Sequence, residues 1–140
     1  MMLKTKYHGE MEIDEAQILK FAGGLPGFVE EKQFVVLPLE EDSPFLILQS
    51  ATTPDLAFVV TSPFFFFKDY EFDLDESTVE ALKIEDANQV QIMVILTVQD
   101  PFNLSTANLQ APIVVNEVNK QAKQVILNHP SYKTKHSIVQ

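Results

Sequence analysis

The chain has 140 residues, of which 46% are hydrophobic, and its 20 acidic residues against 10 lysines give a formal net charge of −10. This size and composition predict one globular domain spanning residues 1–140. Cysteine is absent, which excludes disulfides and thiolate metal sites, and no apolar run approaches the roughly 20 residues that a membrane helix needs.

The charge also bears on the partners that we expect. Acidic residues repel phosphate, and without arginine the chain lacks the side chain best suited to bidentate phosphate contacts. The charge therefore predicts no direct nucleic-acid contact and a basic protein partner. The absence of cysteine and of a long apolar run predicts a cytoplasmic protein with no membrane insertion. Acidic residues also keep small domains soluble, so the charge alone does not decide for binding.

Short apolar runs bounded by turn residues predict strands along most of the chain. The first two form a hairpin over residues 3–13 that turns near His8 and Gly9, and a strand from Gln17 to Phe21 follows. Further strands are predicted at residues 33–38, 44–50, 56–63, 90–98, 113–115 and 123–128. Such spacing indicates a barrel or a sandwich.

The centre of the fold is predicted to be a hairpin of residues 90–98 and 113–115. The first run is rich in β-branched residues and is apolar on both alternation phases, so we expect it to be buried on both faces. Residues 100–103 turn the chain. Pro112 has no N–H group, so it can precede the second strand but cannot sit within its ladder.

One short helix is predicted at about residues 75–84. Asp75 or Ser77 can act as its N-cap, and Glu80 follows Ser77 at the spacing of a capping box. Residues 129–140 are interpreted as a loop and a tail.

Two motifs could bind a ligand, but each has a simpler interpretation. His8, Glu10 and Glu12 share one face of an extended segment and could hold a metal, but we interpret them as a solvated strand face. The glycine-rich residues 23–28 lack the Lys-Ser/Thr continuation of a phosphate loop, so we interpret them as a structural turn. We expect no cofactor.

Residues 62–76 carry the most informative chemistry, because four consecutive phenylalanines precede a run of acidic residues. In an extended chain Phe64 and Phe66 point to one side, and Phe65 and Phe67 to the other. In residues 69–75, acidic residues at odd positions alternate with aromatic and apolar residues at even positions. We call the acidic set the acidic strip; it consists of Asp69, Glu71, Asp73 and Asp75. The predicted partner-binding residues are Phe64, Phe66, Asp69, Tyr70, Glu71, Asp73 and Asp75. Core packing of the phenylalanines is the alternative.

A catalytic set cannot be assembled from the sequence. His8, His129 and His136 lie near the chain ends or in expected loops, and no nucleophile-elbow or nucleotide-binding motif accompanies them. We therefore expect a binding protein rather than an enzyme.

The chain resembles the flagellar assembly factor FliW family over nearly its whole length. The most specific part is a T-x-N-L-x-A-P-I-V-x-N block at residues 106–116, and matching segments lie at residues 23–28, 44–50, 67–74, 95–98, 124–127 and 135–136. Two positions depart from the family pattern: Ala122 stands where glycine is expected, and Lys135 where arginine is expected.

The resemblance implies a mainly β fold, a small closed or partly open β-barrel of short, mostly antiparallel strands with one short helix. It also implies that the protein antagonises the RNA-binding translational repressor CsrA and binds flagellin as the alternative partner. The more basic residues 120–136 are our candidate for flagellin. Two alternatives stay open: a chaperone or adaptor for an export substrate, and a ligand-binding barrel with an open interior.

Overall fold

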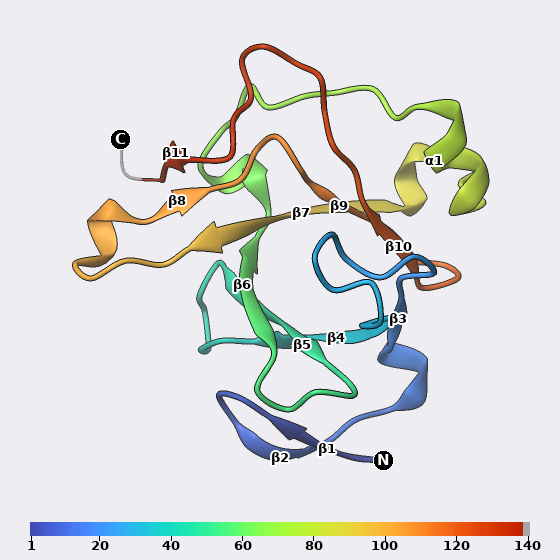
Figure 1. The fold of residues 1–140 in the computed structure, drawn as a ribbon, viewed down its shortest axis with the longest axis vertical. Helices are drawn as coiled ribbons and strands as arrows, with labels where there is room; N and C mark the ends of the chain where they lie inside the picture. Colours follow the sequence, from blue (N-terminus) through green and yellow to red (C-terminus); the bar gives the residue numbers. More distant parts are fainter. Residues whose placement is uncertain (139–140) are drawn as a thin grey trace.

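Seven strands close into a barrel in the computed structural model, which describes residues 1–138 (Figure 1). Around the barrel they follow the order β7-β6-β5-β4-β3-β10-β9, and β9 pairs back with β7. Neighbouring strands are antiparallel except β3 and β10, which are parallel. The strands are β3 (Leu19–Lys20), β4 (Gln33–Pro38), β5 (Phe45–Ser50), β6 (Ala57–Thr61), β7 (Val90–Thr97), β9 (Ile113–Asn116) and β10 (Gln121–Gln124). The predicted fold class is confirmed.

Smaller elements surround this barrel. β1 (Met2–Thr5) and β2 (Gly9–Glu12) form the predicted N-terminal hairpin, and β8 (Thr106–Ala107) and β11 (His136–Ser137) extend the sheet from β7. The α-helix is α1 (Glu76–Ala81), and the 3₁₀ turns are η1 (Glu15–Gln17), η2 (Pro63–Phe65), η3 (Ala87–Gln89) and η4 (Phe102–Leu104). Within residues 1–138, no helix is long and apolar enough to cross a membrane.

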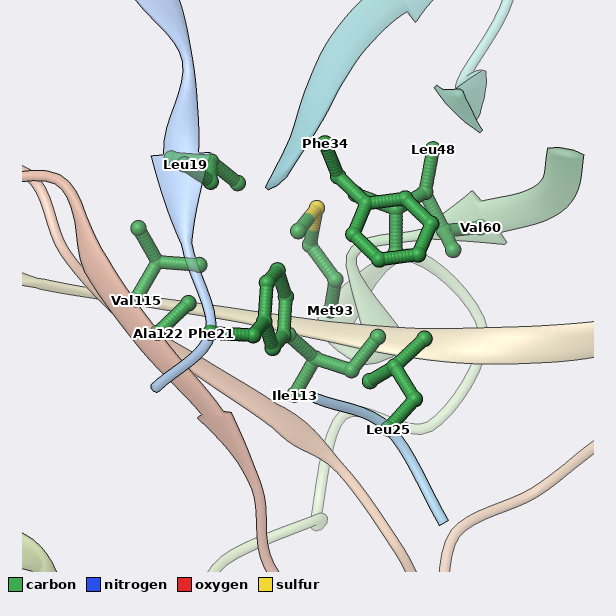
Figure 2. Packing of buried hydrophobic residues seen from close by; sticks show 10 residues of the cluster. All are labelled: Leu19, Phe21, Leu25, Phe34, Leu48, Val60, Met93, Ile113, Val115 and Ala122. Carbon is green, nitrogen blue, oxygen red and sulfur yellow. The ribbon is translucent and has the colours of Figure 1, made fainter. Parts of the chain in front are cut away.

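Side chains from every barrel strand fill the interior (Figure 2). Phe34, Leu48 and Val60 are fully buried there, and Phe21 and Leu25 enter from the chain that follows β3. Burying one such side chain stabilises the fold by roughly 1.5–3 kcal/mol, so this cluster supplies much of the driving force for closure. This filled interior does not support the alternative of a ligand-binding barrel.

The predicted central hairpin is confirmed, but its second strand is split. β7 pairs with β9 from Val90 to Met93 and with β8 at Leu96 and Thr97. The pairs Met93–Ile113 and Leu96–Ala107 are three residues apart along β7. Their partners are six residues apart along the chain that forms β8 and β9. The extra residues loop out just before the strand that follows Pro112. Met93 faces the barrel interior and Val94 faces a second apolar cluster outside, so both faces of β7 are buried as predicted.

Several predicted strand boundaries shift by one or two residues, and β3, β10 and the C-terminal tail also change in extent. The strand expected at residues 17–21 is only Leu19–Lys20, because Asp14 caps the 3₁₀ turn η1 and its capping box includes Gln17. The last predicted strand, residues 123–128, is β10 (Gln121–Gln124). Within the expected tail, β11 pairs with β8, while Val139 and Gln140 lie outside the described residues.

The predicted helix is confirmed over a shorter span, but its capping box is wrong. α1 begins after Asp75, which is the N-cap residue, so Ser77 lies inside the first turn. The helix ends at Leu82, whose carbonyl oxygen accepts hydrogen bonds from the side-chain amides of Asn116 (2.9 Å) and Asn119 (3.0 Å). These two amides satisfy a carbonyl group that the helix itself leaves without a donor.

The glycine-rich residues form the predicted tight turn. Leu25 and Phe28 exchange backbone hydrogen bonds of 3.2 and 2.7 Å, and the buried Leu25 side chain reaches the barrel core. Gly24 has a φ of +68°, and a Cβ atom there would lie 2.5 Å from the carbonyl oxygen of Val29. Both the backbone conformation and the close approach therefore require glycine at this position.

We expect Gly24→Ala to destabilise the protein more than either neighbouring glycine variant. Gly27 also has a positive φ (+84°) but open space around it, so Gly27→Ala should cost only the roughly 1–2 kcal/mol of the left-handed conformation. Gly23→Ala meets neither obstacle and should stay within about 0.5 kcal/mol of the parent. Urea denaturation of the three variants measures this order; equal losses at positions 23 and 24 would contradict it.

Candidate partner-binding face

The segment that joins β6 to α1 crosses the outside of the barrel (Figure 1, green). The phenylalanine run was predicted to be extended. It is instead partly helical, because Pro63 begins the 3₁₀ turn η2. The expected two-sided alternation is therefore wrong. Phe64 and Phe65 are exposed, whereas Phe66 and Phe67 are half-buried in the second apolar cluster. Core packing thus holds for only two of the four rings.

The alternation predicted for residues 70–75 is confirmed. Tyr70 is buried and Phe72 and Leu74 are half-buried, while all four carboxylates of the acidic strip are exposed. The apolar side chains hold this extended segment against the barrel, and their spacing sends the acidic side chains towards solvent.

Tyr70 fixes the segment in place. Its hydroxyl donates a 2.8 Å hydrogen bond to the carbonyl oxygen of Leu109, and its ring packs edge-on against Tyr132 at 4.6 Å. The hydroxyl of Tyr132 in turn accepts a 3.0 Å bond from the backbone N–H of Glu71. Burial, with a smaller contribution from Tyr132, raises the pKa of Tyr70 above its usual range.

This burial changes the role assigned to Tyr70. Only 3% of its surface is accessible, so it offers a partner almost no contact area and instead positions the acidic residues beside it. Phe66 is likewise turned inward and stacks on Phe45 with 5.7 Å between ring centres. Leu109 and Tyr132, the partners of Tyr70, were not predicted, since they lie 39 and 62 residues away along the chain.

A groove of about 590 Å³ runs along this segment. Its floor is apolar and includes Phe72, Ile84 and Ile92, with the exposed Phe64 at one side. Four carboxylates line it as well, those of Glu71, Asp73, Glu85 and Asp86, and within residues 1–138 neither lysine nor histidine does. We call this the acidic groove. An apolar floor with acidic walls suits a basic, partly apolar protein segment.

The structure therefore divides the predicted site. Phe64, Tyr70, Glu71 and Asp73 line the acidic groove, and Glu85 and Asp86 join them from a loop that sequence reasoning missed. Asp69 lies in a neighbouring hollow with His129 and His136. Asp75 lies at the start of α1, where a hydrogen bond from the Thr78 side chain is the main cause that lowers its pKa, and Lys123 adds to the effect.

The histidines have structural roles in the described chain. His8 makes a 2.8 Å hydrogen bond with the carbonyl oxygen of Pro38, and His129 and His136 accept the backbone N–H groups of Ser131 and Lys133. Within residues 1–138, no group of three or more histidine, aspartate or glutamate side chains is arranged to hold a metal. The candidate metal trio of His8, Glu10 and Glu12 is therefore not arranged as a set of metal ligands.

Comparison with known proteins decides the family. The family model described as FliW protein matches residues 2–138. The chain belongs to the FliW family. It is 62% identical over 138 residues to the flagellar assembly factor FliW of Bacillus subtilis strain 168, covering 99% of this chain and 96% of the relative. The corresponding protein of Geobacillus thermodenitrificans strain NG80-2 is 56% identical over 138 residues, with 99% and 95% covered.

A solved structure agrees with this assignment. The crystal structure of the flagellar assembly factor FliW superposes with a TM-score of 0.95 at 52% identity, covering 100% of this chain and 98% of that one. Both the strand arrangement and the segment that carries the acidic groove thus lie within a fold observed in a FliW crystal.

The residues that carry the resemblance to the FliW family build the split strand beside β7. The side chain of Asn108 accepts 3.1 Å hydrogen bonds from the backbone N–H groups of Gln110 and Ala111, and Asn116 binds the end of α1. Of the two departures, Ala122 fits in the barrel core and Lys135 is exposed. Neither lies in the acidic groove.

Tyr70→Phe should destabilise the fold more than Tyr132→Phe. The first change leaves the buried carbonyl oxygen of Leu109 without this donor, which costs about 1–3 kcal/mol. The second frees the N–H group of the exposed Glu71, where water can replace the hydroxyl. Thermal unfolding of both variants measures the difference, and a loss for Tyr132→Phe equal to that for Tyr70→Phe would show that the hydroxyl of Tyr70 is not the anchor.

Proposed function

We propose that this chain is a flagellar assembly factor that binds the RNA-binding translational repressor CsrA through the acidic groove and relieves repression. The observation that carries the proposal is the groove itself, in which four carboxylates border an apolar floor. The relatives that match nearly the whole chain bear the name flagellar assembly factor, which supports the flagellar setting.

Charge and shape both favour this repressor as the partner. A protein that binds RNA must present basic surface to phosphates, and a chain of net charge −10 attracts such a surface over distances of about 8 Å at physiological ionic strength. The apolar floor then supplies contact area that charge alone would not. Because the carboxylates border apolar side chains, we infer that the groove takes a segment beside the RNA-binding surface.

Flagellin is the proposed alternative partner. Free flagellin would occupy the factor, and its export would release the factor to capture the repressor, so that flagellin translation resumes. The candidate region for flagellin is residues 120–136. It contains four lysines and no acidic residue, and the nearest acid before it is Glu117. This assignment rests on charge and on the family resemblance.

A chaperone or adaptor for an export substrate is the second candidate. The observation in its favour is the exposed pair Phe64 and Phe65, together with the exposed Phe102 and Leu104 of η4. Such apolar surface marks interaction sites without requiring a role in translation. Co-purification with an RNA-binding repressor from motile cells separates the two functions, because a pure chaperone would bring down only the export substrate.

The double variant Glu71→Lys with Asp73→Lys tests the acidic groove. Both carboxylates are exposed and lie outside helix caps, so each change should alter stability by no more than about 0.5 kcal/mol. Placing two positive charges opposite a basic partner should weaken binding by several kcal/mol, measured by calorimetry with purified repressor.

Glu40→Lys with Glu41→Lys is the matched control. These residues are exposed in the turn between β4 and β5 and change the net charge equally, so only long-range attraction should fall. The proposal fails if the groove variant folds normally and keeps the affinity of the parent. Similar losses in the groove and control variants would indicate that net charge, and not the groove, directs binding.

The two partners are expected to exclude each other. A switch requires that one bound state depletes the other, which needs a coupling free energy of at least about 1–3 kcal/mol. Titrating purified flagellin into the complex with the repressor, followed by size-exclusion chromatography, should release free repressor. A stable ternary complex would contradict the exchange.

A further inference from the structure

A second groove lies over the short parallel pairing of β3 with β10. Its volume is about 760 Å³, and the glycine-rich turn forms one wall while the end of α1 forms another. Leu25, Leu82 and Ala122 form a buried apolar floor, and Val29 is exposed at the rim. We call it the lysine groove.

The charge of this groove is opposite to that of the whole chain. Lys20, Lys83 and Lys123 line it, and among the described residues no aspartate or glutamate does. The chain as a whole has two acidic residues for every lysine, so a local set of three lysines without an acid departs from its surroundings. Lys123 also lies near Asp75 outside the groove, whose pKa it helps to lower, so Lys20 and Lys83 carry most of the charge that favours an acidic ligand.

Along this groove β10 continues beyond its pairing with β3, and its edge is partly covered, since Ala122 is buried and Gln124 is half-buried. β3 and β10 share only one registered pair, Lys20 with Gln121, and the backbone N–H of Lys20 donates to the carbonyl oxygen of Lys120 at 2.8 Å. Successive residues of a strand alternate in direction, so the backbone groups of Ala122 and Gln124 face the same side as Lys120. β3 has already ended there, since Phe21 donates its N–H to Lys32 and the chain then turns at Gly24.

We propose that an extended, acidic and partly apolar segment of a partner protein adds to β10 in the lysine groove. An unpaired strand edge is a ready template for another strand. Its backbone would bond with the carbonyl group of Ala122 and the N–H group of Gln124, as in other cases of strand addition. Alternate side chains would enter the apolar floor and meet the three lysines. This surface is separate from the acidic groove. β10 and Lys123 fall within residues 120–136, the candidate region for flagellin, but the inference is argued from the lysine groove alone.

The test uses a synthetic probe and the full chain. The probe is a capped hexapeptide of alternating valine and glutamate, titrated into ¹⁵N-labelled protein, and the comparison peptide carries lysine in place of glutamate. We expect only the acidic peptide to shift the amide signals of Ala122 and Gln124, and to slow hydrogen exchange at the Gln124 amide. Equal binding of both peptides, or signal shifts confined to other regions, would overturn the proposal.

Charge reversal supplies the matched variants. Lys20→Glu with Lys83→Glu should weaken binding of the acidic peptide at least tenfold, whereas Lys32→Glu with Lys135→Glu, at exposed positions outside the groove, should change it less than twofold. The amide spectrum shows whether each variant is folded. If the reversal unfolds the chain, Lys20→Gln with Lys83→Gln takes its place and should weaken binding at least threefold.

The variant Glu71→Lys with Asp73→Lys keeps the two grooves distinguishable. It should bind the acidic peptide like the parent, since neither residue lines the lysine groove. Unchanged affinity in the folded lysine-groove variant would rule out this site, whatever the outcome for the repressor.

Discussion

The pairing of β7 with both β6 and β9 is the constraint on which the rest of the structure depends. It closes the sheet into a barrel and places β7 where both of its faces are buried. The inward face packs Met93 into the core, but the outward face, with Val94 and Leu96, needs a cover of its own. The chain must therefore supply a second apolar layer outside the barrel.

That outer layer is also what creates the acidic groove. Residues 66–72 and 125–138 pack over β7 and β8, and Tyr70 joins the two segments to the split strand through Leu109 and Tyr132. Once Tyr70, Phe72 and Leu74 are held inward, the alternation of an extended chain turns Glu71 and Asp73 outward. The same side chains thus stabilise the fold and determine where the carboxylates lie.

The two grooves lie beside different strands of the barrel and differ in charge. The acidic groove borders the first residues of β7, whereas the lysine groove lies at the short parallel pairing of β3 with β10. A protein with two surfaces of opposite charge can distinguish a basic partner from an acidic one by electrostatics before close contacts form. Net charge alone, at −10, would have suggested only the first kind of partner.

The sequence alone determined the elements whose signals are local. Apolar runs predicted the barrel strands, residues 90–98 and 113–115 predicted the central pairing, the spacing of residues 70–75 predicted outward carboxylates, and the block at residues 106–116 indicated the family. Contacts between distant residues were decided only by the tertiary structure. They include the burial of Tyr70 under Leu109 and Tyr132, the arrival of Glu85 and Asp86 beside Glu71, and the single parallel pair of β3 with β10. Such contacts leave no periodic pattern, because they depend on how the sheet closes and not on neighbouring residues.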